Sequence, residues 1–173
     1  MTSGAIVTGM TITPGFAVDA QVLLVTRVAR LALEQISAEH PCTGWRRPAK
    51  PEPRFWGNDM AGACSIAALA LARLLRRRGI DAVFVMGDFD GGGSCTHCWV
   101  EVGTLRLDIT ATQFKKPAVH ITRVGEDGDL YDCEMRGLAA HRDAANWLWP
   151  SNTQRRWVDR ICRRAERLLR RGV

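Results

Sequence analysis

Two alternating segments around a two-residue turn constrain the fold of this chain most. Residues 97–102 (HCWVEV) and 105–110 (LRLDIT) alternate in side-chain character, which is typical of β-strands with two different faces. Gly103 opens the turn between them, and glycine at the first turn position favours a two-residue β-hairpin. Because the turn length sets the register, it also decides which residues face each other across the two strands.

The register of this hairpin brings two candidate catalytic residues together. Glu101 faces Arg106, and opposite charges at facing positions support this pairing. His97 and Asp108 then become diagonal neighbours on one face, with backbones about 7–8 Å apart. That separation allows a hydrogen bond between imidazole and carboxylate, whereas a shift of one residue would put the two side chains on opposite faces.

An apolar helix before the hairpin carries a cysteine near its start. The segment 64–75 has few polar residues, which predicts a buried helix. The arginines at 76–78 suit the negative end of its dipole, and Gly79 favours termination there. The positive end of the dipole stabilises a thiolate at Cys64. Two helix starts remain open, because a cap at Asp59 would move Cys64 from the first turn to the second.

The order of these residues resembles the core of the transglutaminase-like superfamily. The matching positions are Cys64, Arg78-Gly79-Ile80, Ala82, Gly87, His97, Trp99-Val100-Glu101, Leu107-Asp108 and Thr110. These cysteine enzymes share a papain-like α+β fold and include transglutaminases, bacterial peptidases and enzymes that remove leader peptides. The resemblance covers residues 62–110. It implies Cys64 as nucleophile, His97 as general base and acid, and Asp108 as the residue that orients the imidazole.

Two positions depart from the pattern of the transglutaminases proper. Ser65 stands where those enzymes often have tryptophan, and Ile109 replaces the proline frequent between the aspartate and the threonine. Both departures favour a hydrolytic or processing relative over a cross-linking enzyme. We therefore expect a cysteine-dependent amide-bond hydrolase, a peptidase or deamidase that forms a thioester acyl-enzyme without a cofactor. Acyl transfer by the same triad is the alternative.

Four further residues are candidates for substrate or transition-state contacts. Asn58 lies shortly before Cys64, where papain-like enzymes often carry a side-chain amide that helps to bind the oxyanion. The alternative role for Asn58 is to cap a loop. Trp56, Trp99 and Gln113 are candidates for the substrate groove. For Trp56 an anchor between loop and core is an equally good interpretation. The substrate itself is expected to be a peptide or protein.

Length and composition favour one domain of the α+β class. A chain of 173 residues can bury a sizeable core, so we assign 1–173 to one domain with its core at about 58–124. We expect N-terminal helices, one of them at 18–36, packed on an antiparallel sheet. No segment approaches the ~20 apolar residues of a membrane span. Six cysteines without a secreted framework, and no secretory signal at 1–16, predict a cytoplasmic protein with reduced thiols.

A basic amphipathic helix is expected at about 151–171. Its eight arginines, less Asp159 and Glu166, equal the net charge of the chain, +6. Such a helix can dock on an acidic partner or an anionic surface. The alternative, which we favour from the sequence, is a solvated face with Asp159–Arg163 and Glu166–Arg170 pairs along the helix. Nucleic acid is a poorer candidate because no base-reading motif is present.

A zinc site is the remaining alternative. The run Cys95-Thr96-His97-Cys98 resembles half of such a site, which Cys42, Cys133 or His120 would complete. Structural zinc sites usually join two paired-ligand motifs, and the sequence has no second one. We therefore expect no metal, and a non-enzymatic zinc-binding or interaction module stays a second alternative.

Overall fold

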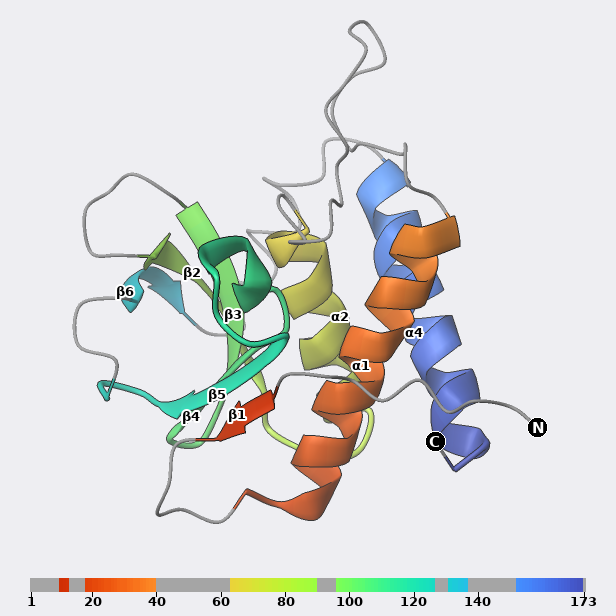
Figure 1. The fold of residues 1–173 in the computed structure, drawn as a ribbon, viewed down its shortest axis with the longest axis horizontal. Coiled ribbons are helices and arrows are strands. Elements are labelled where there is room, and N and C mark those ends of the chain that lie inside the picture. Colours follow the sequence, from red (N-terminus) through yellow and green to blue (C-terminus); the bar gives the residue numbers. More distant parts are fainter. Residues whose placement is uncertain are drawn as a thin grey trace, which may run out of the picture.

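The computed structural model describes residues 10–12, 18–39, 63–89, 96–126, 131–136 and 152–172, and these form an α+β fold (Figure 1). The strands are β1 (Met10–Ile12), β2 (Val83–Phe89), β3 (Thr96–Val102), β4 (Leu105–Asp108), β5 (Val119–Arg123) and β6 (Tyr131–Arg136). The helices are α1 (Ala20–Glu39), α2 (Cys64–Arg76), the short 3-10 helix η1 (Ala111–Phe114) and α4 (Asn152–Arg170). The predicted α+β class is therefore confirmed.

The described strands form one sheet in the order β1-β5-β4-β3-β2-β6. The pairs β2–β3, β3–β4, β4–β5 and β2–β6 are antiparallel, as predicted, whereas β1 runs parallel to β5 at the edge. The expectation of a purely antiparallel sheet is thus wrong at β1. No tight turn joins β1 to β5, since both α1 and α2 lie between them in the sequence, so nothing local requires an antiparallel pair.

The hairpin has the predicted register. Val102 pairs with Leu105, Glu101 with Arg106 and Val100 with Leu107. Gly103 has a φ of 57°, a conformation that glycine adopts without steric cost and that a two-residue hairpin turn requires at this position. The register therefore comes from local turn chemistry, and it puts the even-numbered residues of β4 on the same face as the odd-numbered residues of β3.

The main core lies between one face of the sheet and the helices (Figure 1). From the sheet it takes Phe84, Met86, Cys98, Val100, Leu107, Val119 and Ile121, and Ile109, directly after β4, joins them. Helix α2 packs against β2, β3, α1 and α4, which explains why it is apolar on nearly every side. Because α2 is enclosed in this way, the position of its first residue, Cys64, is fixed relative to β3.

Helices α1 and α4 complete the helical layer. Helix α1 begins after Asp19, whose carboxylate accepts the N–H groups of Gln21 and Val22, a standard N-cap. The helix predicted at 18–36 buries Val22, Val25, Ala29, Ala32 and Ile36, and α4 buries Val158, Ile161, Cys162, Ala165 and Leu168 against α1 and α2. None of the helices in the described ranges is long and apolar enough to cross a membrane.

The opposite face of the sheet is polar and aromatic, yet it is buried. Its buried polar and aromatic members are His97, Trp99, Glu101, Arg106, Asp108, Thr110, His120, Thr122 and Tyr131, and the aliphatic Val85 packs among them. Buried polar groups are costly unless they are hydrogen-bonded, so a cluster of this size points to a role beyond packing. The candidate catalytic histidine and aspartate belong to this face.

Candidate functional site

Cys64 is the first residue of α2. Of the two helix starts left open by the sequence, the structure has the one that puts Cys64 in the first turn. Ala63 precedes it without a capping side chain, and Cys64 itself is half-buried. The first-turn N–H groups have no carbonyl partner within the helix, so both they and the helix dipole favour negative charge at this position.

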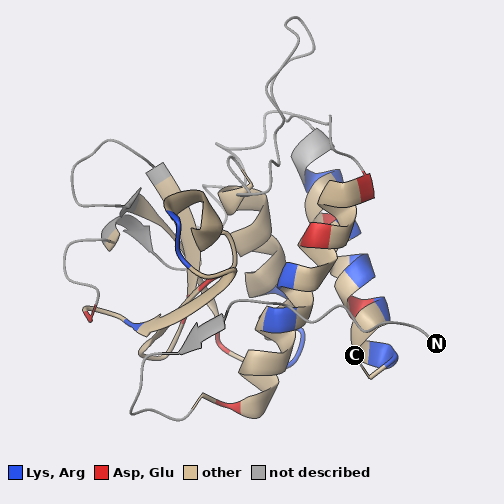
Figure 2. Cartoon of the chain, in the orientation of Figure 1, with Lys and Arg blue, Asp and Glu red and all other residues tan. Residues whose placement is uncertain are grey.

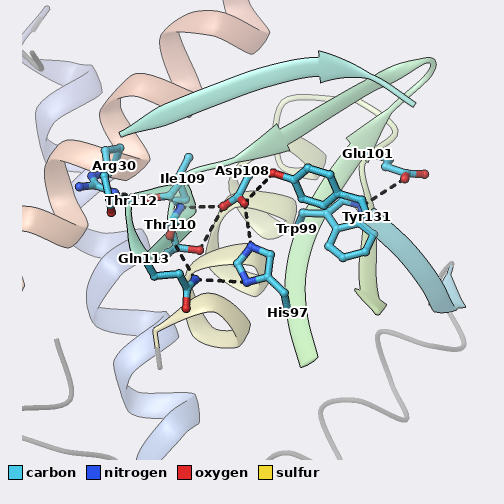
Figure 3. Close-up of polar contacts among 10 residues, drawn as sticks. All are labelled: Arg30, His97, Trp99, Glu101, Asp108, Ile109, Thr110, Thr112, Gln113 and Tyr131. Atoms are coloured by element: carbon cyan, nitrogen blue, oxygen red, sulfur yellow. Dashed lines mark hydrogen bonds and ion pairs between the residues drawn. The ribbon is translucent and has the colours of Figure 1, made fainter. Parts of the chain in front are cut away.

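His97 and Asp108 form a buried pair across the hairpin. His97 Nε2 lies 2.7 Å from Asp108 Oδ2, and the two side chains are 0% and 1% exposed (Figure 3). This is the imidazole–carboxylate contact that the register predicts. Because Nε2 is engaged by the carboxylate, Nδ1 is the nitrogen left to exchange protons with a nucleophile.

Asp108 is held from two further directions (Figure 3). Its Oδ1 accepts the backbone N–H of Thr110 at 2.8 Å and the Thr110 hydroxyl at 3.1 Å. Its Oδ2 also accepts the hydroxyl of Tyr131 at 3.2 Å. Thr110 belongs to the sequence pattern, but Tyr131 does not. Tyr131 comes from β6, which is separated from β3 by β2 in the sheet, and no local pattern links it to the hairpin.

The rest of the His97 ring is enclosed as well. Gln113 Nε2 lies 3.2 Å from His97 Nδ1 and donates to Thr110 O at 3.1 Å. The Phe114 ring packs edge to face against the imidazole, with the two ring centroids 4.8 Å apart. An amide offers both a donor and an acceptor, so Gln113 can donate to a neutral imidazole and, after rotation, accept from an imidazolium. Gln113, predicted for the substrate groove, thus lies beside the reactive nitrogen.

The charges of this pair reinforce each other. Burial opposes the charged forms of both groups, but their mutual attraction outweighs it. The charge and hydrogen bond of Asp108, with a contribution from Cys64, raise the pKa of His97 to about 10. His97 and the Thr110 hydrogen bonds in turn lower the pKa of Asp108. At neutral pH the pair is therefore an imidazolium and a carboxylate.

The surroundings of Cys64 favour its thiolate. A hydrogen bond from the Cys98 thiol lowers the pKa of Cys64 most; burial opposes it, and the hydrogen bond and charge of His97 lower it further. The net pKa of Cys64 lies well below its ordinary value, whereas the same hydrogen bond and burial raise that of Cys98. Cys98 points to the helix side of β3, as its place in the alternation predicts. Its contact with Cys64 was not predicted, because it depends on how α2 packs against β3.

Trp99 occupies a different environment from the one a groove residue needs. It is 1% exposed, packs edge to face on Tyr131, and donates from Nε1 to Glu101 Oε1 at 3.1 Å. The Arg106 guanidinium lies over the rings of Tyr131 and Trp99, at 4.2 and 5.7 Å from their centroids. We therefore assign Trp99 to the buried layer that supports the histidine, and not to a substrate groove.

Several predicted residues lie outside the described residues: Trp56, Asn58, Cys42 and Cys95. For Cys133 the structure describes only the backbone, in β6, while His120 is buried in β5 opposite Asp108. Within the described ranges, no group of three or more His, Cys, Asp or Glu side chains could hold a metal ion. The zinc alternative therefore rests on the sequence alone.

Comparisons of this chain with family models, with curated proteins and with solved structures return no match. The transglutaminase-like resemblance thus stays a prediction from the sequence.

Proposed function

We propose that this chain is a cysteine-dependent amide-bond hydrolase, a peptidase or deamidase with a transglutaminase-like, papain-like core. One observation supports the proposal most. A buried carboxylate–imidazole pair, 2.7 Å apart, lies beside a thiol at a helix N-terminus, and the pKa of that thiol is lowered. Nucleophile, base and orienting group within mutual reach are the requirement for cysteine catalysis.

In the proposed first half-reaction the Cys64 thiolate attacks the carbonyl carbon of an amide. The negative charge moves to the carbonyl oxygen, and the positive end of the α2 dipole, where Cys64 lies, favours that charge. His97 gives a proton from Nδ1 to the leaving nitrogen, the C–N bond breaks, and an amine or ammonia departs. Cys64 is left as a thioester, and Asp108 keeps the imidazole oriented throughout.

In the second half-reaction neutral His97 takes a proton from water. The resulting hydroxide attacks the thioester carbon, the C–S bond breaks, and the products are a carboxylic acid and the Cys64 thiolate with an imidazolium. An amine in place of water gives acyl transfer, the alternative outcome of the same chemistry. The hydrolytic preference rests on the resemblance and its two departures at Ser65 and Ile109.

Substrate profiling tests this proposal directly. The protein is incubated with peptide libraries and with glutamine-side-chain libraries, with and without an added primary amine. Hydrolysed products that disappear in Cys64→Ser support the hydrolase, and amine adducts support the transferase. If Cys64→Ser releases the same products at the same rate as the native protein, the cysteine mechanism is wrong. A reducing compartment such as the cytoplasm suits the proposed enzyme, because Cys64 must stay a free thiol.

A second candidate function concerns the basic helix α4 (Figure 2). The two acidic residues of α4 form ion pairs with arginines outside α4. Asp159 binds Arg73 of α2 at 2.5 Å, and Glu166 binds Arg78, just after α2, at 2.9 Å. The pairs expected along α4 are thus replaced. Exposed arginines of α4, among them Arg156, Arg163 and Arg167, are left to face solvent. This observation favours docking on an acidic partner or an anionic surface more than the sequence did.

A further inference from the structure

We propose that Arg30 of α1 is a positioning residue of the catalytic site, which fixes the turn that orients His97. This inference rests on the proposed function and names a residue that lies far from the triad in the sequence. Arg30 is 3% exposed, although α1 has exposed positions, such as Arg27, that would leave a guanidinium in water. A buried arginine carries a desolvation cost, so its hydrogen bonds must offset that cost.

The guanidinium of Arg30 binds the segment that follows Asp108 (Figure 3). Its Nη1 donates to the backbone carbonyl of Ile109 at 2.7 Å and to the hydroxyl of Thr112 at 3.3 Å. Its Nε donates to Glu34 at 2.7 Å, one turn along α1, so the guanidinium is held in orientation by its own helix. Charge-assisted hydrogen bonds of this kind are stronger than neutral ones and depend on the planar fork of arginine.

The segment that Arg30 holds makes three separate contacts with His97. Asp108 binds Nε2, Gln113 lies 3.2 Å from Nδ1, and Phe114 packs edge to face on the ring. The Arg30 contacts lie between these points in the sequence, at Ile109 and Thr112. A shift of this segment would therefore move every group that sets the orientation of the imidazole, without altering the chain of β3 that carries it.

A purely structural role for Arg30 makes a different prediction. If Arg30 only stabilises the packing of α1, its loss lowers the melting temperature and leaves the chemistry of the folded protein unchanged. If Arg30 positions the turn, its loss also weakens the contact between His97 and Cys64. The thiolate of Cys64 is then less stabilised. Its pKa therefore rises toward the value of an ordinary cysteine, about 8.5.

The experiment measures the rate of Cys64 alkylation by iodoacetamide as a function of pH in the folded full-length protein. Arg30→Met keeps the length and apolar stem but removes the donors, and Arg27→Met is the matched control on an exposed position of the same helix. We expect Arg30→Met to shift the alkylation midpoint to higher pH and to lower kcat on the order of 10–100-fold with little change in KM. Arg27→Met should change neither.

Arg30→Lys and Thr112→Val keep the inference testable if Arg30→Met does not fold. Both should shift the midpoint in the same direction by a smaller amount, because each removes part of the contact. An unchanged midpoint and kcat in every folded Arg30 variant would overturn the inference. His97→Ala separates this outcome from failure of the proposed function: if alkylation of Cys64 does not depend on His97 at all, the cysteine mechanism itself is wrong.

Discussion

At the scale of single residues, the site is an arrangement of hydrogen bonds around one imidazole. Asp108 receives four of them, from His97, from the backbone and hydroxyl of Thr110, and from Tyr131. A carboxylate with this many donors stays charged in a buried position, which is what the imidazolium of His97 requires. The orientation and the protonation state of His97 therefore have the same origin.

The first prediction concerns this carboxylate. Asp108→Asn keeps the shape of the side chain but removes its charge, so the imidazole loses its orienting anion. Turnover should fall by roughly 10²–10⁴-fold while the far-ultraviolet circular dichroism spectrum stays native. Tyr131→Phe is the milder companion, because it removes one of four hydrogen bonds and should cost about 1 kcal/mol or less in activation free energy. Equal turnover in native protein and Asp108→Asn would exclude Asp108 from catalysis.

The second prediction is the pH dependence of kcat/KM. On the acidic side, activity rises with pH as Cys64 loses its proton. Because the pKa of Cys64 is lowered, this rise should occur at a pH below the ordinary pKa of cysteine. On the alkaline side activity is lost as His97 gives up its proton with a pKa of about 10. The plateau should therefore be wide and include neutral pH. In Asp108→Asn the alkaline limb should move to lower pH, since Asp108 raises the pKa of His97; an unmoved limb would contradict this assignment.

At the scale of elements, local chemistry decides what the sequence predicts well. The hairpin register follows from Gly103 and from the facing pair of Glu101 and Arg106, so the His97–Asp108 contact follows from the sequence alone. The start of α2 does not, because two caps compete for it. The ion pairs of α4 were predicted incorrectly, since arginines at 73 and 78, outside α4, bind its acidic residues.

The third prediction concerns α4 as a docking element. Substituting Arg156, Arg163 and Arg167 with glutamine should abolish salt-sensitive retention of the protein on a polyglutamate matrix and leave hydrolysis of a small substrate unchanged. The matched control replaces Arg27, Lys115 and Arg123 with glutamine. These residues are also exposed, and their substitution removes the same amount of charge from other parts of the chain. If both triple variants lose retention equally, net charge alone is responsible and α4 is only a solvated face.

At the scale of the whole molecule, the contacts that the sequence could not predict are those between distant segments. Tyr131 reaches Asp108 from β6, Cys98 meets Cys64 where α2 packs on β3, and Arg30 holds the turn after β4 from α1. Each depends on tertiary packing, for which no spacing rule exists. The sequence predicts Cys64, His97 and Asp108 as one site, and the assembled fold adds Tyr131, Cys98 and Arg30 around them.

The central claim is that Cys64 is an activated thiol, and competitive alkylation tests it most directly. The native protein is treated at neutral pH with limiting iodoacetamide, and mass spectrometry locates the label. We predict that Cys64 reacts first, because its pKa is lowered, whereas the pKa of Cys98 is raised and burial raises that of Cys162 to about 11. The preference should weaken in His97→Ala, because the hydrogen bond and charge of His97 are lost while the larger contribution, the Cys98 hydrogen bond, remains. Labelling of Cys64 no faster than that of the other cysteines, with the same pattern in His97→Ala, would contradict the account.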